Sequence, residues 1–421
     1  MSVNVVTFGC RLNTYESQLI ERYAKVAKVQ NVVIFNSCAV TSEAERQLRQ
    51  AIRKAKRSNP DAKIIVTGCA AQISPEKYAS MQEVEHVIGN DEKLKQGTYA
   101  SIGQGSDIEE RVLVNDIMSV KETAHHLISG INDRARAFLQ VQNGCNHRCT
   151  FCIIPYGRGN SRSVPVGEIV QNAKKLTEEG YKELILTGVD ITDYGSNLPG
   201  NPTLGNMIAR LLNLVPDLPR LRLSSIDVAE IDDELFHLIA TEKRFMPHLH
   251  LSLQAGDNMI LKRMKRRHNR EQVIEFCKKI KKARPEIVFG ADIIAGFPTE
   301  TDEMFKNTLN IIEDAGLTYL HIFPYSPRPG TPAARMPQVK REIIKERAKA
   351  LRKRGAEMLK KHLDSQVEKI LNVLLEKENF GHAEDHTPVK LTEAKCKDDV
   401  GKILQYRVIS SDNSFVNAVK A

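Results

Sequence analysis

The sequence Cys145-Asn-His-Arg-Cys149-Thr-Phe-Cys152 decides the fold and the chemistry of the central part of this chain. Its three cysteines fall within eight residues, directly after an apolar run at Phe138–Gln142 that predicts a strand. A loop of this kind can wrap one iron–sulfur cluster, and three thiolates on a four-iron cube leave one iron open for chemistry. The alternative is a zinc site, but zinc prefers paired cysteines with a distant second pair, and no such pair follows in the sequence.

Strand-like runs alternate with helical patterns along the rest of the central region. They lie at Phe138–Gln142, Glu183–Thr187, Leu221–Ser224, His248–Leu253, Val288–Ile294 and Tyr319–Phe323. Six β/α units predict a parallel sheet curved into a partial barrel, with fewer strands than the eight of a closed barrel. We expect a partial barrel to leave its side open to a bulky substrate.

Three more cysteines, Cys10, Cys38 and Cys69, each follow a predicted buried strand in the N-terminal region. The strands are expected at Val3–Phe8, Asn31–Phe35 and Lys63–Thr67, and the spacings of Asn13 with Glu16 and of Ser42 with Glu45 suggest capping boxes for the helices between them. This alternation predicts a small doubly wound α/β domain. Because the ends of parallel strands share one edge of a sheet, the three thiolates should meet there. Their odd number argues against disulfides, so we interpret them as a second cluster site, again one ligand short.

Length and composition set the domain organisation. The chain has 421 residues, 41% of them apolar and 27% charged, which predicts about three globular domains. The expected units are an N-terminal α/β domain at 1–102, a connector at 103–136, the partial barrel with a basic C-terminal helix at 137–363, and a small β-barrel at 364–421. No apolar run reaches the ~18 residues of a membrane span, so a cytoplasmic protein is expected. Cysteines in that reducing compartment bind metal or react rather than form disulfides, although Cys277 and Cys396 receive no role.

Positive charge is concentrated in two segments. The formal net charge is +9, but Lys262–Arg284 alone carries +9 and Lys340–His362 carries +7. Two basic helical faces on a mildly acidic body suggest a polyanion as partner, with nucleic acid as the first candidate. Solvated lysine-rich helix faces remain the alternative explanation.

Two incomplete cysteine triads followed by a small β domain resemble the methylthiotransferases of the radical S-adenosylmethionine superfamily, over essentially the whole chain. Further matching segments are Ile153–Arg158, Ser161–Ser163, His248–Gln254, Asp292–Glu300 and Tyr325–Pro332. The terminal domain is similar to the TRAM module, an RNA-binding β-barrel of this family. Thr7–Asn13 and Leu186–Asp190 look most like the branch that acts on threonylcarbamoyladenosine in tRNA. The isopentenyladenosine branch would have Gln-Met after Cys10, and the branch that modifies an aspartate of a ribosomal protein usually has Pro-Lys or similar there.

The resemblance implies a function and a set of cofactors. The function is insertion of a methylthio group at C2 of N6-threonylcarbamoyladenosine at position 37 of tRNA, with two four-iron clusters and two molecules of S-adenosylmethionine per turnover. The implied partners are the anticodon region of tRNA and an electron donor such as flavodoxin or ferredoxin, and a monomer is expected. The same chemistry on isopentenyladenosine tRNA or on the ribosomal protein is the alternative. An RNA-binding protein with structural metal sites is the non-enzymatic alternative, but structural sites are normally closed and both triads here are one ligand short.

Individual site residues follow from the same resemblance. The six triad cysteines are the implied cluster ligands. The implied contacts to S-adenosylmethionine are Phe151, Gly188, Asp190, Ser225 and Gln254, most of which stand at predicted strand ends. Two arginines, Arg158 and Arg162, are open to a role toward either the cofactor carboxylate or RNA phosphate.

Overall fold

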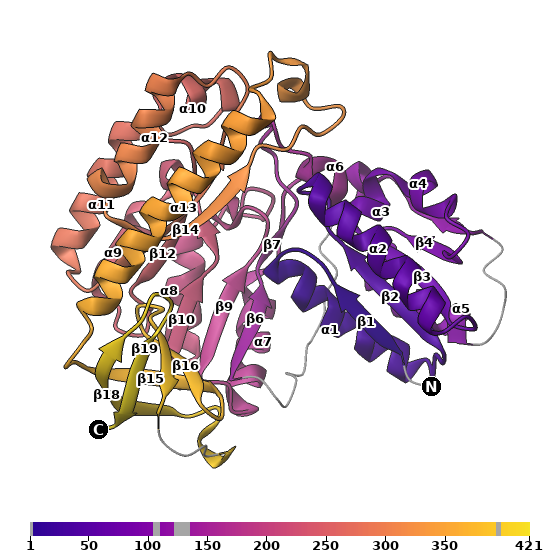
Figure 1. The fold of residues 1–421 in the computed structure, drawn as a ribbon. Helices are drawn as coiled ribbons and strands as arrows, with labels where there is room; N and C mark the ends of the chain where they lie inside the picture. Colours follow the sequence, from indigo (N-terminus) through magenta and orange to yellow (C-terminus); the bar gives the residue numbers. More distant parts are fainter. Residues whose placement is uncertain (1–2, 104–109, 122–134, 393–396) are drawn as a thin grey trace.

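The computed structural model describes residues 3–103, 110–121, 135–392 and 397–421. Cys396 and most of the expected connector at 103–136 lie outside these residues. Three groups of elements are seen in Figure 1: an N-terminal sheet with its helices, a central barrel-like sheet, and a small C-terminal barrel. Within the described ranges, no helix is long and apolar enough to cross a bilayer.

The N-terminal group is a parallel five-stranded sheet. Its strands, in sheet order, are β1 (Asn4–Thr7), β2 (Val32–Ser37), β3 (Lys63–Gly68), β4 (His86–Ile88) and β5 (Val112–Leu113). Its helices are α1 (Arg11–Val26), α2 (Ser42–Ser58), α3 (Cys69–Ile73), α4 (Pro75–Ala79) and α5 (Gln96–Gly103).

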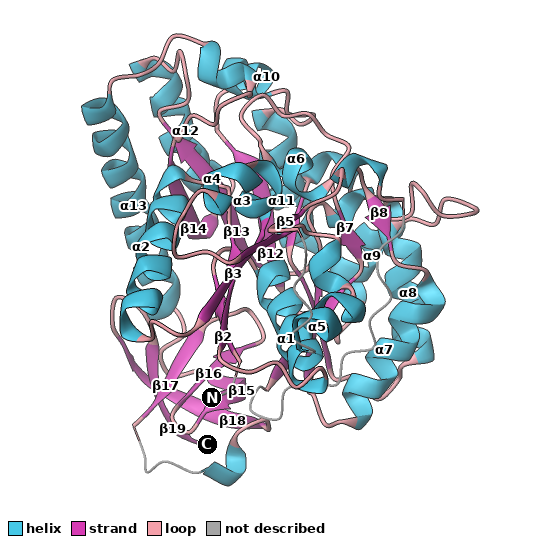
Figure 2. Cartoon of the chain, turned by 90° about the vertical axis from the view of Figure 1, so that its right-hand side faces the viewer, coloured by secondary structure: helices cyan, strands magenta, loops and turns pink. Residues whose placement is uncertain are grey.

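Helices cover both faces of this sheet because its central strands are apolar on both sides. Ile34 and Ile65 pack in one core with residues of α1 and α5, whereas Phe35 and Ile64 pack in another with residues of α2. Figure 2 shows α2 on one side of β2 and β3, and α1 with α5 on the other. The predicted α/β domain with helices on both faces is therefore confirmed.

The start of α1 corrects one predicted capping box. The helix begins at Arg11 with Cys10 as its N-cap, so Asn13 and Glu16 lie inside its first two turns. Asn13 is buried and donates from Nδ2 to the backbone oxygen of Ser37 at 3.0 Å. Glu16 is fully buried, so neither side chain caps the helix. Both are polar groups of the interior.

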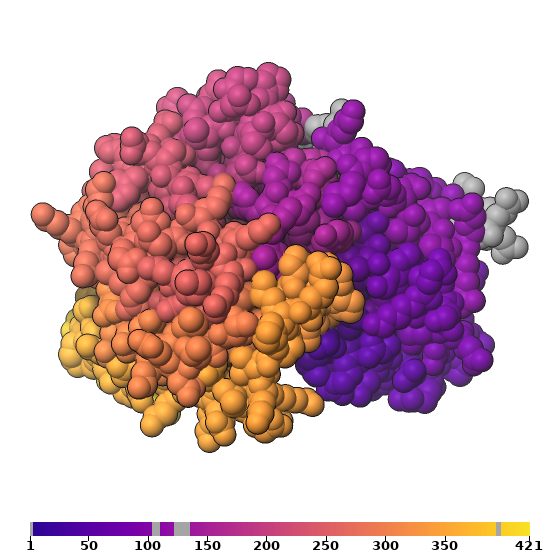
Figure 3. Space-filling view, turned by 90° about the horizontal axis from the view of Figure 1, so that it is seen from above, coloured from indigo at the N-terminus to yellow at the C-terminus, as the bar shows by residue number. Residues whose placement is uncertain are grey.

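The start of α2 corrects the other capping box. Thr41, not Ser42, is the N-cap, and its side chain accepts a hydrogen bond from the backbone N–H of Ala44 at 3.1 Å. Glu45 is buried, and its carboxylate pairs with Lys77 and with Arg328, which lies beyond the last barrel strand. Figure 3 shows the orange segment that follows this strand lying against the indigo N-terminal domain.

The central sheet is a partial barrel of parallel strands. One part has the order β10 (Arg220–Leu223), β9 (Glu183–Thr187), β6 (Arg136–Gln140), and the other has the order β11 (Ser225–Ile226), β12 (His248–Gln254), β13 (Val288–Ala295), β14 (Leu317–Pro324). Ser224 joins β10 directly to β11, so the two parts provide six consecutive strand positions. This confirms the predicted partial barrel.

Helices pack around the outside of this barrel (Figure 1). They are α7 (Val166–Glu178), α8 (Leu204–Leu214), α9 (Asp233–Thr241), α10 (Asn258–Met264), α11 (Arg270–Ala283), α12 (Asp302–Asp314) and the long α13 (Arg341–Asp364), which packs on β14. Strand alternation separates core from cavity. Leu249, Leu251 and Leu253 of β12 are buried in the core against these helices, whereas His250 and Ser252 face the barrel interior.

The C-terminal group is a closed five-stranded barrel. Its order is β15 (Ile370–Lys377), β16 (Phe380–Ala383), β17 (Pro388–Leu391), β19 (Val416–Lys420), β18 (Ile403–Ser411). It lies at the amino ends of the central strands. Arg136, the first residue of β6, pairs with Glu376 at 2.6 Å, and Arg222 of β10 donates to the backbone oxygen of Glu384 at 3.0 Å. The carboxyl ends of the central strands lie at the opposite end of the barrel, where the loops that carry the cysteines are found.

Candidate active site

One cavity of about 690 Å³ is lined by all eleven residues that the resemblance assigned to the clusters and to S-adenosylmethionine. Its lining includes Cys10, Cys38, Cys69, Cys145, Cys149 and Cys152, and also Phe151, Gly188, Asp190, Ser225 and Gln254. The cavity lies where the carboxyl ends of the barrel strands meet the cysteine edge of the N-terminal sheet. The two triads, which are more than seventy residues apart in sequence, therefore face the same space.

The first triad lies on the loop between β7 (Gln142–Asn143) and α6 (Ile154–Arg158). Cys145 donates from Sγ to Asp190 Oδ2 at 3.4 Å, and Arg266 donates from Nη1 to Cys149 Sγ at 3.6 Å. Burial raises the pKa of the Cys152 thiol to about 12, and the neighbouring Cys149 adds to the effect. All three cysteines line the same cavity and are partly exposed to it.

The second triad is assembled from three strand ends, as predicted. Cys10 precedes α1, Cys38 follows β2, and Cys69 begins α3 directly after β3. Gly9 has φ +102°, and a Cβ at this position would lie 2.8 Å from Cys38 Cβ and 3.0 Å from Cys38 Sγ. The chain can bring Cys10 this close to Cys38 only through a glycine. Burial, together with the neighbouring Cys69 and Cys10, raises the pKa of the Cys38 thiol to about 12.

A buried polar network lies beneath the second triad. Arg158 of α6 donates from Nε to Cys69 Sγ at 3.1 Å and from Nη2 to Glu16 Oε2 at 2.9 Å. Lys93 approaches the same carboxylate, with Nζ 2.6 Å from Glu16 Oε2. Burial alone would raise the pKa of Glu16, but the two cations hold it below its ordinary value. Arg158 is therefore committed to the protein interior.

Arg162, unlike Arg158, does not line the cavity. Its Nη2 donates to the backbone oxygen of Arg158 at 2.9 Å, and its Nη1 donates to that of Asn160 at the same distance. The two roles left open for Arg158 and Arg162, toward the cofactor carboxylate or RNA phosphate, do not agree with these contacts. Both arginines are buried and bond within the protein, because α6 folds back against the N-terminal sheet.

The donor set of each triad fits a four-iron cluster. A buried thiol with a raised pKa is poor at holding negative charge alone, whereas a bound metal deprotonates a coordinating thiol outright. Arg266 approaches a sulfur of the first triad, and Arg158 and Asn90 approach Cys69 of the second, with Asn90 Nδ2 at 3.8 Å. Hydrogen-bond donors around the ligating sulfurs are the usual surroundings of iron–sulfur clusters.

The strand ends of β9 and β12 carry the residues assigned to S-adenosylmethionine. At Gly188 a Cβ would lie 2.8 Å from the backbone oxygen of Gln142, so only glycine fits this crossing of strand and loop. Asp190 donates its backbone N–H to Gln142 Oε1 at 2.9 Å and pairs with His147 Nε2 at 3.0 Å. Gln254 has a φ of +72°, in the left-handed region that residues other than glycine adopt uncommonly.

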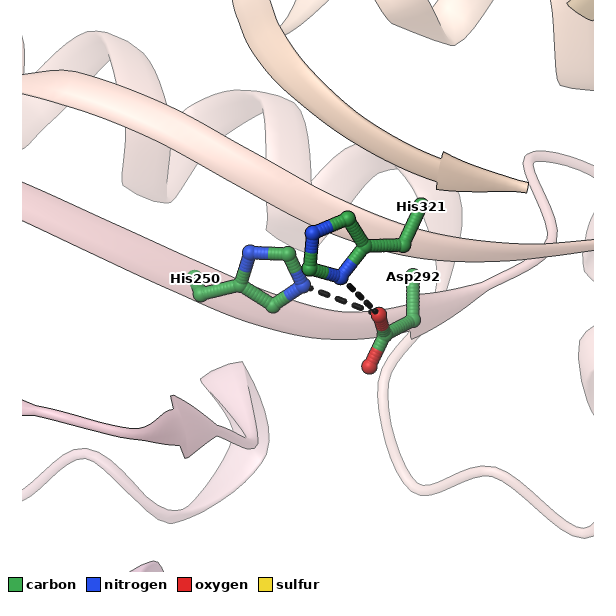
Figure 4. Close-up of side chains that lie close together, drawn as sticks. All are labelled: His250, Asp292 and His321. Carbon is green, nitrogen blue, oxygen red and sulfur yellow. Dashed lines mark hydrogen bonds and ion pairs between the residues drawn. The ribbon is translucent and has the colours of Figure 1, made fainter. Parts of the chain in front are cut away.

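Three residues that the sequence did not indicate form a polar cluster on adjacent strands of the cavity wall. His250 of β12 and His321 of β14 both contact Asp292 Oδ1 of β13, at 2.9 Å from Nε2 and 3.2 Å from Nδ1 respectively (Figure 4). Burial alone would raise the pKa of Asp292, but these two hydrogen bonds hold it far below its ordinary value. The signal in the sequence is weak, because the three residues lie on three different strands and no local spacing links them.

Arg266 does not contribute to the basic face that was predicted to bind a polyanion. It belongs to the basic segment Lys262–Arg284, which the sequence suggested as a face for a polyanion. Arg266 instead pairs with Asp227 at 2.8 Å inside the site, and Asp227 also accepts from His268 Nδ1 at 3.1 Å. The lysines of α11, among them Lys278 and Lys282, are exposed as expected.

The fold and the site together define a radical S-adenosylmethionine protein: a partial β/α barrel with a CxxxCxxC loop at the carboxyl ends of its strands. In agreement, the sequence model of the radical SAM superfamily matches residues 139–312, and that of uncharacterized protein family UPF0004 matches residues 2–89. Among solved structures, the radical S-adenosylmethionine methyltransferase TsrM from Kitasatospora setae superposes with a TM-score of 0.57. The match covers 79% of this chain and 77% of that one at 16% identity, so it supports the fold alone.

Curated relatives cover the whole chain. The threonylcarbamoyladenosine tRNA methylthiotransferase MtaB of Rickettsia prowazekii is 57% identical over 99% of this chain and 96% of its own length. The tRNA-2-methylthio-N(6)-dimethylallyladenosine synthase of Finegoldia magna is 30% identical over 98% of this chain and 92% of its own. The chain therefore belongs to the radical S-adenosylmethionine methylthiotransferases, in the threonylcarbamoyladenosine branch.

Proposed function

We propose that this protein is the enzyme that inserts a methylthio group at C2 of N6-threonylcarbamoyladenosine at position 37 of tRNA. The high identity to the Rickettsia prowazekii enzyme across the full chain supports the substrate. The observation that carries the chemistry is the single cavity lined by both cysteine triads. Attaching sulfur to an unactivated carbon requires that the activating group and the sulfur source meet at the substrate, and one shared cavity satisfies this requirement.

The proposal assigns one four-iron cluster to each triad. Cys145, Cys149 and Cys152 would hold the cluster that binds S-adenosylmethionine, as the radical SAM family implies. The N-terminal triad would hold a second cluster, which agrees with the buried thiols of Cys38 and Cys69 and with the arginine bonded to Cys69. When both are bound, the first supplies radical chemistry with S-adenosylmethionine and the second holds the sulfur to be transferred.

Polar residues at the strand ends would orient the cofactor. Asp190 is a carboxylate held beside the first triad, and its position suits the amino group of S-adenosylmethionine. Gly188 allows close approach of the backbone, while Ser225 and Gln254 offer hydrogen-bonding groups for the ribose or carboxylate of the cofactor. Phe151 lines the same wall and packs edge-on against Phe297 at 6.3 Å, which fixes its ring.

The histidine cluster would offer a hydrogen-bonding group to the nucleoside. His321 bonds to Asp292 through Nδ1, so its Nε2 is left to accept a hydrogen bond. Its side chain is 60% exposed and lines the cavity. Asp292 keeps the ring of His321 in this orientation. The cluster therefore provides a hydrogen-bond acceptor in the cavity that both triads share.

The accompanying proposals follow from the chemistry. Two molecules of S-adenosylmethionine are consumed per product, one as the radical source and one as the methyl donor. The anticodon region of tRNA is the binding target, a small reductase such as flavodoxin or ferredoxin supplies the electron, and the enzyme acts as a monomer in the cytoplasm. The domain limits 1–102, 137–363 and 364–421 are part of the same proposal.

Mass spectrometry of tRNA nucleosides tests the function directly. A strain that lacks this gene should accumulate threonylcarbamoyladenosine and lose its methylthio derivative, and a plasmid copy should restore it. Loss of methylthio-isopentenyladenosine instead would assign the enzyme to the other tRNA substrate. Unchanged tRNA together with loss of the modification on the ribosomal-protein aspartate would assign the enzyme to the branch that acts on that protein. No change in any of the three, with a colourless purified protein, would favour a structural metal protein.

A further inference from the structure

Arg11 is a positively charged side chain in the cavity that has no partner among the described residues. It is the first residue of α1, directly after Cys10, and it lines the cavity together with the second triad. The other two arginines of the cavity lining are paired: Arg158 with Glu16 and Arg266 with Asp227. Arg11 makes no hydrogen bond or ion pair with any residue of the ranges that the structure describes.

Two carboxylates, Asp292 and Glu183, attract the charge of Arg11, but each is already paired with another side chain. Asp292 accepts hydrogen bonds from His250 and His321. Glu183 accepts from Arg222 Nε at 2.9 Å. Arg11 therefore brings a surplus positive charge into a half-buried position. Such a charge is costly unless a ligand supplies the missing anion.

The proposed substrate carries an anion at the right place. C2 and N6 of adenine lie on the same edge of the base and are separated by N1. A base whose C2 faces sulfur on the N-terminal triad therefore directs its N6 substituent along the wall beside that triad. In threonylcarbamoyladenosine this substituent ends in a carboxylate. In dimethylallyladenosine, which gives its name to the product of the Finegoldia magna relative, it is a hydrocarbon.

We infer that the Arg11 guanidinium binds the carboxylate of the threonylcarbamoyl group and thereby selects this nucleoside over one with an apolar N6 substituent. The inference rests on the proposed function. A guanidinium presents paired N–H donors that match a carboxylate, and such charge-assisted bonds are the strong ones. A hydrocarbon substituent would leave Arg11 without a counter-charge, so the same residue also disfavours the wrong substrate.

The test compares three anticodon stem-loop RNAs with the anaerobic holoenzyme. One carries threonylcarbamoyladenosine, the second carries its methyl ester, and the third carries isopentenyladenosine. Binding is measured by fluorescence anisotropy, and kcat and KM are measured separately. The wild type should bind the acid at least about tenfold more tightly than the ester. Arg11→Gln should reduce this ratio to within about twofold, mainly through KM for RNA, and Arg11→Lys should fall between the two.

Lys25→Gln is the matched control, because Lys25 is an exposed cation of the same helix that pairs with Glu21. It should behave as the wild type. The inference is overturned if Arg11→Gln keeps the preference for the acid, if it weakens all three RNAs equally as a phosphate contact would, or if it raises KM for S-adenosylmethionine instead. If Arg11→Gln loses iron, the wild type decides alone: equal affinity for acid and ester overturns the inference. If the wild type modifies only the isopentenyl RNA, the proposed function fails and the inference fails with it.

Discussion

Arg158 Nε lies 3.1 Å from Cys69 Sγ, so the helix that directly follows the first cysteine triad holds a cysteine of the second. The same guanidinium bonds to Glu16 of α1, which lies six residues beyond Cys10. A single buried residue thus ties the loop that carries one triad to two of the three segments that carry the other. The relative position of the two triads is therefore a property of the packed interior.

Arg158→Lys should weaken the second cluster selectively. A lysine keeps the positive charge but cannot bond to both Glu16 and Cys69, because the planar fork of the guanidinium is lost. We expect the iron content to fall from about eight toward about four per chain, with S-adenosylmethionine cleavage retained and methylthiolation reduced. The neighbouring Arg162→Lys serves as the control, because Arg162 donates to the backbone oxygens of Asn160 and Arg158 and contacts no cysteine in these bonds. Full iron content and activity in Arg158→Lys would contradict this account.

Single cysteine variants should separate the two halves of the chemistry. Cys10→Ala is expected to cleave S-adenosylmethionine and form 5′-deoxyadenosine without thiolating RNA, because it removes a ligand of the second site only. Cys149→Ala should lose both reactions. Product analysis by liquid chromatography checks this, with Cys277→Ala, a buried cysteine of the core, as the control. Normal thiolation by Cys10→Ala would contradict the assignment of a second cluster to the N-terminal triad.

Asp292→Asn should lower methylthiolation by about tenfold to a hundredfold while iron content stays that of the wild type. The substitution keeps the shape of the side chain but removes the charge that both histidines contact. Because a misplaced contact to the substrate acts on the chemical step, the loss should fall on kcat rather than on KM. An unchanged kcat would argue that the cluster has only a packing role.

The C-terminal barrel should loosen from the central barrel as the pH falls. His386 stacks on His382 at 4.6 Å and contacts His248 at 4.9 Å across the junction. Burial, together with the positive charge of Arg222 and the neighbouring imidazoles, holds the pKa of both His248 and His386 well below the ordinary value.

The sign of the effect follows from proton uptake. Unfolded chains take up protons on these rings near pH 6.5 and the folded protein does not, so stability falls below that pH by up to about 1.4 kcal/mol per pH unit for each ring. His386→Asn removes one such ring, and asparagine tolerates the positive φ of 71° at this position. The decrease in Tm between pH 7 and pH 5.5 should be smaller in His386→Asn than in the wild type. The control His237→Asn, which alters an exposed histidine, should show the same decrease as the wild type. An equal loss in all three would contradict the assignment.

Much of the architecture could be predicted from local patterns. Strands buried on both faces are nearly continuous apolar runs, and Glu183–Thr187 was predicted with the observed limits. The convergence of Cys10, Cys38 and Cys69 was also predictable, because parallel strands deliver their ends to one edge. Both predictions rest on short-range pattern plus one topological rule.

The rest of the site depends on contacts between distant segments. Asn13 and Glu16 have the spacing of a capping box, and only the packing of Arg158 and Lys93 against them reveals why they are buried. His321 is one polar residue in a strand until β12 and β13 place His250 and Asp292 beside it. Sequence reasoning could not find Arg11 for the same reason: the absence of a partner is visible only when all neighbours are in place.

The central claim is that two separate four-iron clusters face one cavity, and iron analysis of two triple variants tests it most directly. The first replaces Cys145, Cys149 and Cys152 by alanine, and the second replaces Cys10, Cys38 and Cys69. Iron and sulfide are quantified after anaerobic reconstitution, together with the Mössbauer spectrum. The account predicts about eight irons per chain in the wild type and about four in each variant, with four-iron signals in both. Two results would contradict the claim of two clusters. One is that the variant without Cys10, Cys38 and Cys69 keeps the full iron content of the wild type. The other is that the variant without Cys145, Cys149 and Cys152 loses all iron while remaining folded.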